Sequence, residues 1–188
     1  MTLQPEKPRI LIVDDHPANR LAFQILLEPH YTVHIAEGGE EALRCVLQSD
    51  YAVILLDVRM PRMDGFEVAQ ALRQRERTRH TPIVFMSAYD QTVLQARKGF
   101  VAGATDFIFS PVDEELLKHK VATYVQMTLR NDALRLQVEQ LEQSVRALQA
   151  ELALCATGES VWTKINGLER QIEEIRREVG TLPAWGVS

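Results

Sequence analysis

The sequence has few cysteines and no long apolar run. Only Cys45 and Cys155 occur among its 188 residues, which is too few for a disulfide framework or a zinc site, so we expect reduced thiols. No apolar run reaches the roughly eighteen residues that a membrane span requires, and the N-terminus, MTLQPEKPRI, lacks the apolar segment of a secretory signal. The sequence therefore predicts a cytoplasmic protein with no membrane partner.

The sequence also lacks an excess of positive charge. Its net charge is −5, which argues against nucleic acid as the main partner. The one basic cluster is the run Arg73, Arg75, Arg77 and Arg79, which we interpret as the solvated end of a helix. DNA binding would depend on this run alone and is the least favoured function.

The composition is that of a soluble globular protein, with 46% hydrophobic and 25% charged residues. A chain of 188 residues can hold one well-buried domain and an extension, but hardly two full domains. We expect an N-terminal tail at residues 1–8, a domain at 9–125 and a helical extension after it.

Short apolar runs alternate with amphipathic stretches through the expected domain, which is typical of a parallel sheet covered by helices on both faces. Strands are predicted at residues 9–13, 31–36, 51–57, 82–87 and 106–109. Helices are predicted at residues 17–28, 40–48, 65–75 and 92–102, with Pro17 suited to a first helical turn. The predicted fold class is α/β, a doubly wound five-stranded parallel sheet, in which ligands bind outside the carboxyl ends of the strands.

Polar side chains gather where three of these strands end. Asp14 and Asp15 follow the first strand, Asp57 ends the third and Ser87 ends the fourth. Two carboxylates about 4 Å apart repel by roughly 4 kcal/mol at an effective dielectric of about 20, so such a group takes up protons or holds a cation. Oxygen ligands alone suit Mg²⁺. Helix capping would explain any one of these aspartates, but not all of them at one edge.

Four stretches resemble the blocks of bacterial response-regulator receiver domains, which have a flavodoxin-like fold: IVDDHPANR (12–20), LLDVRMPRMDGFE (55–67), PIVFMSA (82–88) and GATDFIFSP (103–111). The resemblance covers about residues 8–125 and is most specific from Asp57 to Gly65. It implies two-component signal transduction, in which Asp57 accepts a phosphoryl group from a histidine kinase or a phosphotransfer protein.

The same resemblance implies a magnesium site. Asp15 and the backbone carbonyl of Arg59 would bind Mg²⁺ together with Asp57, and Asp14 would act through water. The three aspartates are also the residues that the strand ends bring to one edge of the sheet, whereas the role of Arg59 is implied by the resemblance alone.

The resemblance also implies switch residues and reveals one departure from the family. Ser87 takes the place of the hydroxyl residue that closes on the phosphoryl oxygens, and Phe107 that of the switch aromatic. The family has a lysine just before the proline that corresponds to Pro111, where this chain has Ser110. Serine cannot supply that cation, so we expect slower phosphorylation and a weaker conformational readout.

A heptad repeat continues past the domain, so we expect the last helix to run on as a coiled coil at residues 126–156. A single helix cannot bury this stripe, which favours a homodimer, and a polar residue at an a position fits a parallel pair. The predicted dimer seam is Asn131, Leu134, Val138, Leu141, Val145, Leu148 and Leu152.

A break is expected at residues 157–160, followed by a second amphipathic helix at 161–180 and a tail at 181–188. The second helix could continue the coil or fold back as a hairpin. A milder stripe on the first helix favours the hairpin, and hence a four-helix bundle in the dimer. Its residues are Ala133, Leu136, Ala147, Ala150 and Leu154.

The leading function is a phosphorylation-dependent signalling module that is not an enzyme and acts on an unidentified effector protein. A phosphate-independent scaffold is the alternative, supported by Ser110. A phosphatase that uses Asp57 as its nucleophile is a third hypothesis, but no second acidic group is placed for general acid catalysis. The sequence is also compatible with a piece of a longer chain.

Overall fold

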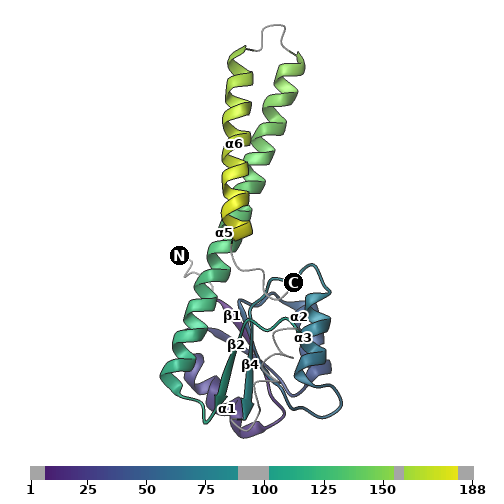
Figure 1. The fold of residues 1–188 in the computed structure, drawn as a ribbon, viewed down its shortest axis with the longest axis vertical. Coiled ribbons are helices and arrows are strands. Elements are labelled where there is room, and N and C mark those ends of the chain that lie inside the picture. Colours follow the sequence, from purple (N-terminus) through teal and green to yellow (C-terminus); the bar gives the residue numbers. More distant parts are fainter. Residues whose placement is uncertain (1–6, 89–101, 155–158, 182–188) are drawn as a thin grey trace, which may run out of the picture. The chain divides into compact units, whose positions relative to one another are not determined.

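The structure is a computed structural model that describes residues 7–88, 102–154 and 159–181 (Figure 1). They fall into two compact units, one that reaches Thr128 and one that begins at Leu129. The helix predicted at residues 92–102 lies outside the described residues except for its last position, as do most of both predicted tails.

The first unit contains the predicted sheet. Its strands are β1 (Arg9–Val13), β2 (Thr32–Ala36), β3 (Val53–Asp57), β4 (Ile83–Ala88) and β5 (Asp106–Ser110). They are all parallel and lie in the order β2-β1-β3-β4-β5. The prediction of a five-stranded parallel sheet is therefore confirmed, and the strand order reverses beside β1 and β3.

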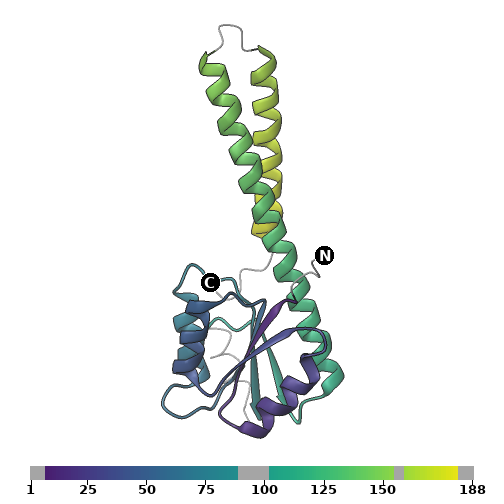
Figure 2. The same ribbon diagram turned by 180° about the vertical axis from the view of Figure 1, so that it is seen from behind.

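Helices cover both faces of this sheet because successive strand residues point to opposite sides. On one face, α1 (Pro17–Leu27) and the first turns of α5 (Glu114–Leu154) pack through Leu27, Leu117 and Val121. On the other, α2 (Gly39–Gln48) and α3 (Gly65–Arg73) pack through residues such as Val46 and Leu72, as Figures 1 and 2 show. Pro17 begins α1 as predicted.

The arginine run that begins at the last residue of α3 is only partly a solvated helix end. Arg73 is half-buried, and its guanidinium donates hydrogen bonds to the carbonyl oxygens of Gly103 at 2.7 and 2.9 Å and of Thr81 at 2.9 Å. Burial lowers its pKa to about 10. Arg77 pairs with Asp50 at 2.5 Å. The interpretation of the whole run as solvated was therefore wrong for Arg73, which binds loop carbonyls.

The second unit, called the helical hairpin below, consists of α5 from Leu129 onward and α6 (Glu159–Thr181). The two helices lie side by side in both views (Figures 1 and 2). Arg130 near the start of the unit pairs with Glu178 near its end at 2.5 Å, and Arg176 pairs with Glu142 at 2.6 Å. The second helix therefore folds back on the first, as the milder stripe had suggested.

The surface that joins these two helices differs from the expected one. The seam residues Val138, Leu141, Val145 and Leu148 pack against α6 of the same chain, in one cluster with Ile165, Leu168 and Ile172. This corrects the expectation that they face a second chain. Large aliphatic side chains on both helices bury more apolar area together than α6 would bury against alanines. The side chain of the seam residue Leu152 lies outside the described part.

None of the described helices combines the length and the apolar character that crossing a membrane requires.

Candidate functional site

The carboxyl ends of β1, β3 and β4 meet at one edge of the sheet. Val13 pairs with Leu56 and Asp57 pairs with Met86, so Asp14 and Ser87 both lie next to the end of β3. A cleft with a cavity volume of about 420 Å³ opens here. Its lining includes Asp14, His16, Asn19, Phe23, Asp57, Arg59, Met86 and Ser87.

Asp14 is the most buried of the acidic residues at this edge, with 2% of the residue exposed. Its carboxylate accepts a hydrogen bond from the backbone N–H of His16 at 2.7 Å and another from Asn19 Nδ2 at 3.0 Å. The guanidinium of Arg20 donates to the Asp14 carbonyl at 2.9 Å. A buried carboxylate needs such donors, and here the first turns of α1 supply them.

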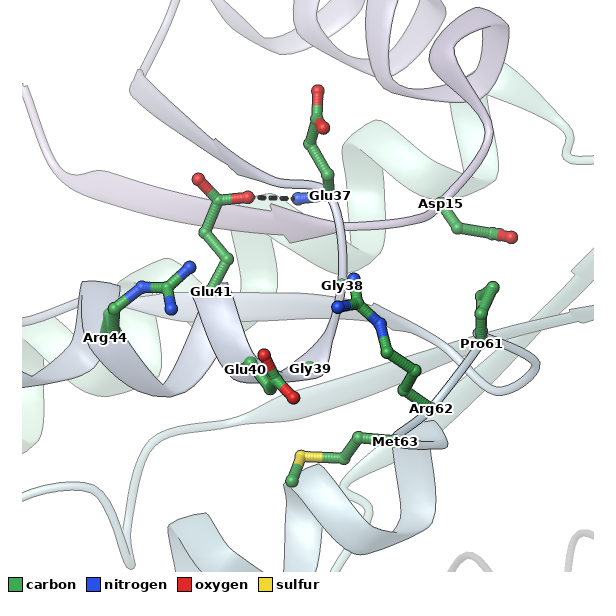
Figure 3. Close-up of a pocket in the computed structure, with 10 residues that line it drawn as sticks. All are labelled: Asp15, Glu37, Gly38, Gly39, Glu40, Glu41, Arg44, Pro61, Arg62 and Met63. Atoms are coloured by element: carbon green, nitrogen blue, oxygen red, sulfur yellow. Dashed lines mark hydrogen bonds between the residues drawn. The ribbon is translucent and has the colours of Figure 1, made fainter.

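Asp15 is more open to solvent, and its Oδ1 lies 2.8 Å from Nδ1 of His16. It lines a second cavity of about 260 Å³, which the turn before α2 and residues 61–63 enclose (Figure 3). In Figure 3 the Glu37 N–H donates to Glu41 Oε2, at 2.8 Å. Arg62 has a left-handed backbone, with φ 70°. The adjacent aspartates thus line different cavities.

At this edge, the carboxyl of Asp57 has a clearly shifted pKa. Burial raises its pKa first, and the carboxylates of Asp14 and Asp15 raise it further, to about 6. The backbone N–H groups of Val58 and Arg59 oppose this shift, and that of Arg59 donates to Asp57 Oδ2 at 3.2 Å. Like charges are therefore concentrated around one half-buried carboxylate, which a nearby cation would stabilise in its ionised form.

These residues fit a divalent cation. The ligand atoms of Asp14, Asp15 and His16 all lie within 4.8 Å of one another. In the described residues, the ion pairs of both aspartates are with the imidazole of His16, which is charged only when protonated. Several carboxylate oxygens with so little opposing charge form the donor set that Mg²⁺ prefers.

Gly65, the first residue of α3, lies directly against the backbone of Asp57. A Cβ at Gly65 would lie 2.3 Å from the Asp57 carbonyl oxygen, so only glycine allows α3 to approach β3 this closely. Asp64 caps α3 by accepting from the Glu67 N–H at 2.8 Å, and the Glu67 carboxylate accepts from the Asp64 N–H at 2.9 Å. This capping box starts the helix directly after the acidic loop.

The predicted switch residues lie on the two neighbouring strands. Ser87 is buried, with 6% exposed, and lines the cleft. Phe107 is half-buried, with its ring centroid 5.3 Å from that of Phe85 and 6.1 Å from that of Phe109. Ser110 ends β5 opposite Ala88, but its side chain lies outside the described part.

Three residues of the site were not singled out from the sequence: His16, Asn19 and Arg20. They follow Asp14 within the first turns of α1, and each contacts Asp14 or Asp15. Their positions two, five and six residues after Asp14 could have indicated that they point back at the strand end, because residues three or four apart share one face of a helix.

Residues 10–122 match the family model of the response regulator receiver domain. A Vibrio cholerae protein named "Probable cyclic di-GMP phosphodiesterase" is 35% identical over 143 residues, which are 76% of this chain and 32% of that protein. The response regulator PleD of Caulobacter vibrioides is 34% identical over 176 residues, 92% of this chain and 38% of that protein. The chain thus spans roughly a third of the length of each relative.

A solved structure has the same fold with a metal ion. It is the receiver domain of the sensor histidine kinase PA1611 of Pseudomonas aeruginosa, with a magnesium ion coordinated in its active-site cleft. Its sequence is 26% identical, and the two structures superpose with a TM-score of 0.59 over 64% of this chain and 98% of that one.

Proposed function

The chain belongs to the response regulator receiver family of two-component signalling, and from this premise we propose that it is a switch phosphorylated on Asp57. The observation that carries the proposal is the environment of Asp57 at the sheet edge. Burial of this side chain, together with the nearby carboxylates of Asp14 and Asp15, raises its pKa to about 6. A histidine kinase or a phosphotransfer protein would donate the phosphoryl group, and the protein would act in the cytoplasm.

In the proposed reaction a carboxylate oxygen of Asp57 attacks the phosphorus, a P–O bond forms, and the bond from phosphorus to the donor breaks. Bound Mg²⁺ would neutralise charge on the phosphoryl oxygens. Asp15, Asp57 and the carbonyl of Arg59 would hold it, and Asp14 would act through water. Ser87 lines the same cleft, and its hydroxyl would donate to a phosphoryl oxygen.

The output would be a change in protein contacts rather than catalysis on a separate substrate. Asp106 begins β5, immediately before Phe107, and its carboxylate accepts hydrogen bonds from Lys120 and from the Tyr124 hydroxyl. Both donors lie on α5, so a movement of β5 at Phe107 would displace this helix through these hydrogen bonds. We also propose that two chains pair through their C-terminal helices and present a surface to an effector protein.

Labelling by a small phosphodonor tests the phosphorylation. Acetyl phosphate with Mg²⁺ should modify the full chain at one site, and the mass shift should disappear in Asp57→Asn and in the presence of a chelator. Ser144→Ala, which changes an exposed hydroxyl of α5, serves as the control and should be labelled normally. Labelling that survives Asp57→Asn would contradict the proposal.

A second candidate is a phosphate-independent scaffold, which Ser110 favours because the family's lysine is missing there. If the weakened charge pairing limits the switch, Ser110→Lys should raise the yield of labelled protein and the response to beryllofluoride. Arg59 lines the cleft and is a candidate substitute for the lost cation, so Arg59→Ala should lower both. A chain that is never labelled, even with Ser110→Lys, would be the scaffold.

A further inference from the structure

The helical hairpin has a second heptad stripe, which faces away from α6. It consists of residues separated alternately by four and three positions, the spacing of a coiled-coil seam. We call it the outer stripe; its described members are Leu129, Ala133, Leu136, Gln140, Gln143, Ala147 and Ala150. All of them are exposed, and Leu136 is 56% exposed whereas Val145 of the α6-facing seam is 7% exposed.

The outer stripe differs from the rest of the exposed surface of α5 in its charge. No member carries a charge, whereas the intervening exposed positions include Asp132, Arg135, Glu139 and Arg146. A face that only contacts water has no reason to exclude charged residues over about 30 Å of helix. Its alanines would let another helix approach closely, since the interaxial distance depends on the side chains at the contact.

We infer that the outer stripe binds the outer stripe of a second copy of this chain, with the two α5 helices antiparallel and each α6 on the far side of its own α5. The inference rests on the proposed pairing of two chains and assigns its surface and its direction. The occupant is a second copy because the stripe is complementary to itself in size and in charge.

Complementarity in size appears when the antiparallel helices share a midpoint between Leu141 and Glu142. Residues at equal distances from that midpoint then meet, so Leu136 lies opposite Ala147 of the second copy and Ala133 opposite Ala150. The large side chain of Leu136 thus meets a small one, and the paired alanines let the two helices approach closely. Gln140 meets Gln143 at the centre, where paired amides can hydrogen-bond and fix the register.

Complementarity in charge favours the same direction. In an antiparallel pair the flanking positions meet their own kind, so Glu139 lies beside Arg146 of the second copy, and the symmetry repeats this pair. In a parallel pair Glu139 would lie beside Ser144 instead. The competing contact of Arg146 within its own chain, to Glu142 at 3.8 Å, is on the surface and therefore weak.

The surface is tested by the mass of the full chain in light scattering over the micromolar range. Leu136→Glu and Ala147→Glu should each raise the dimer dissociation constant by about tenfold or more, since both bury a charge at the interface. Gln149→Glu adds the same charge to an exposed position near Ala147 but outside the stripe, and should leave the constant unchanged. Equal effects of all three variants would overturn the assignment of the surface.

The direction is tested by exchanging the charges. Glu139→Arg and Arg146→Glu should each weaken the dimer, and the double variant should recover wild-type affinity, because the pair re-forms with its signs reversed. A parallel dimer would not recover.

Cysteine cross-linking gives an independent readout of the direction, in chains with Cys45→Ser and Cys155→Ser. Under mild oxidation, differently tagged Leu136→Cys and Ala147→Cys chains should link to each other and not to themselves. Self-linked chains would show a parallel dimer and overturn the inference while pairing stands. A wild-type monomer at every concentration would end both the inference and the proposed pairing, but not the labelling of Asp57.

Discussion

The two units of the chain bury their apolar residues in different ways. We call the unit with the sheet, which reaches Thr128, the receiver unit. In the receiver unit the strand β1 is buried from both sides, and Ile10, Leu11, Ile12 and Val13 are each 0% exposed. In the hairpin only one stripe of α5 is buried, while the outer stripe is exposed. A strand that is apolar on both faces can only lie inside a sheet covered by helices on both sides. A helix with two heptad stripes can pack either stripe against either of two partner helices.

The two units also place their polar groups differently. The receiver unit concentrates carboxylates at one edge of the sheet, where the buried Asp14 accepts hydrogen bonds from the start of α1. The described ion pairs of the hairpin, such as Arg176 with Glu142, lie on exposed or half-buried side chains and contribute little to stability. Polar groups therefore serve the proposed chemistry in one unit and mainly solubility in the other.

The largest effect is expected in the hairpin, whose core is small. Ile165 is 1% exposed in the cluster that joins α5 and α6. Ile165→Ala should therefore lower the free energy of unfolding of the hairpin by about 2–5 kcal/mol. A two-helix unit has little stability to lose. Hydrogen exchange should show α6 unprotected and the sheet unchanged.

Trp162→Ala provides the control, because it removes a larger side chain that is 59% exposed. It should leave most of the protection of α6 intact. If Trp162→Ala were as damaging as Ile165→Ala, the buried face of α6 would have been assigned wrongly.

In the receiver unit, Gly65→Ala should have the next largest effect. The added Cβ would meet the Asp57 carbonyl oxygen at 2.3 Å, and relieving such a contact costs about 1–3 kcal/mol. It should also displace Asp57 and slow its labelling. Gly38→Ala is the matched control, since a Cβ there meets nothing within 4 Å, and it should be labelled like the wild type. Normal labelling of Gly65→Ala would show that α3 can shift without moving Asp57.

The sequence predicted most of the receiver unit, since apolar strands followed by aspartates leave little freedom in a parallel sheet. The edge that joins Asp14, Asp57 and Ser87 follows from strand order alone. The burial of Arg73 could not be predicted in this way, because a guanidinium that binds loop carbonyls has the same sequence signature as one in water. Its partner Gly103 is distant in the chain.

The hairpin shows the limit of periodicity more clearly. Its heptad pattern predicted that α5 would pair with another helix, but not which stripe would face α6. The seam through Val138 and Val145 contacts α6, and the pattern assigned it to a second chain. Both stripes have coiled-coil spacing, so the choice depends on the apolar area of the partner, which a single-helix pattern does not contain.

A smaller effect is expected from Asp57→Asn on stability. The pKa of Asp57 is raised to about 6 in the folded chain, against about 4 in an unfolded one. The folded chain therefore binds this proton more tightly, and its stability falls as the pH rises through that window. Above it, Asp57→Asn should stabilise the metal-free receiver unit by about 1 kcal/mol, allowing for solvent screening.

Below the window the wild-type carboxyl is protonated, so this advantage of Asp57→Asn should vanish, and Mg²⁺ should reduce it at neutral pH by stabilising the wild type. Both tryptophans, Trp162 and Trp185, lie outside residues 1–128, so exchange of the sheet amides is the suitable measurement. A gain that is independent of pH would mean that the pKa of Asp57 is not raised in the folded chain.

The smallest effect is expected at Gly167. Replacing this glycine by alanine should stabilise the fold, whereas Gly65→Ala should destabilise it. Gly167 lies inside α6, and a Cβ there meets nothing within 4 Å. Alanine is favoured over glycine inside a helix by about 0.5–1 kcal/mol, so Gly167→Ala should increase the exchange protection of α6 and leave the sheet unchanged. The dissociation constant of the dimer should also stay the same, because the proposed pairing uses the outer stripe of α5. A loss of dimer in Gly167→Ala would place the second copy against α6 instead, since a methyl group can only be unfavourable there if another surface already covers the glycine.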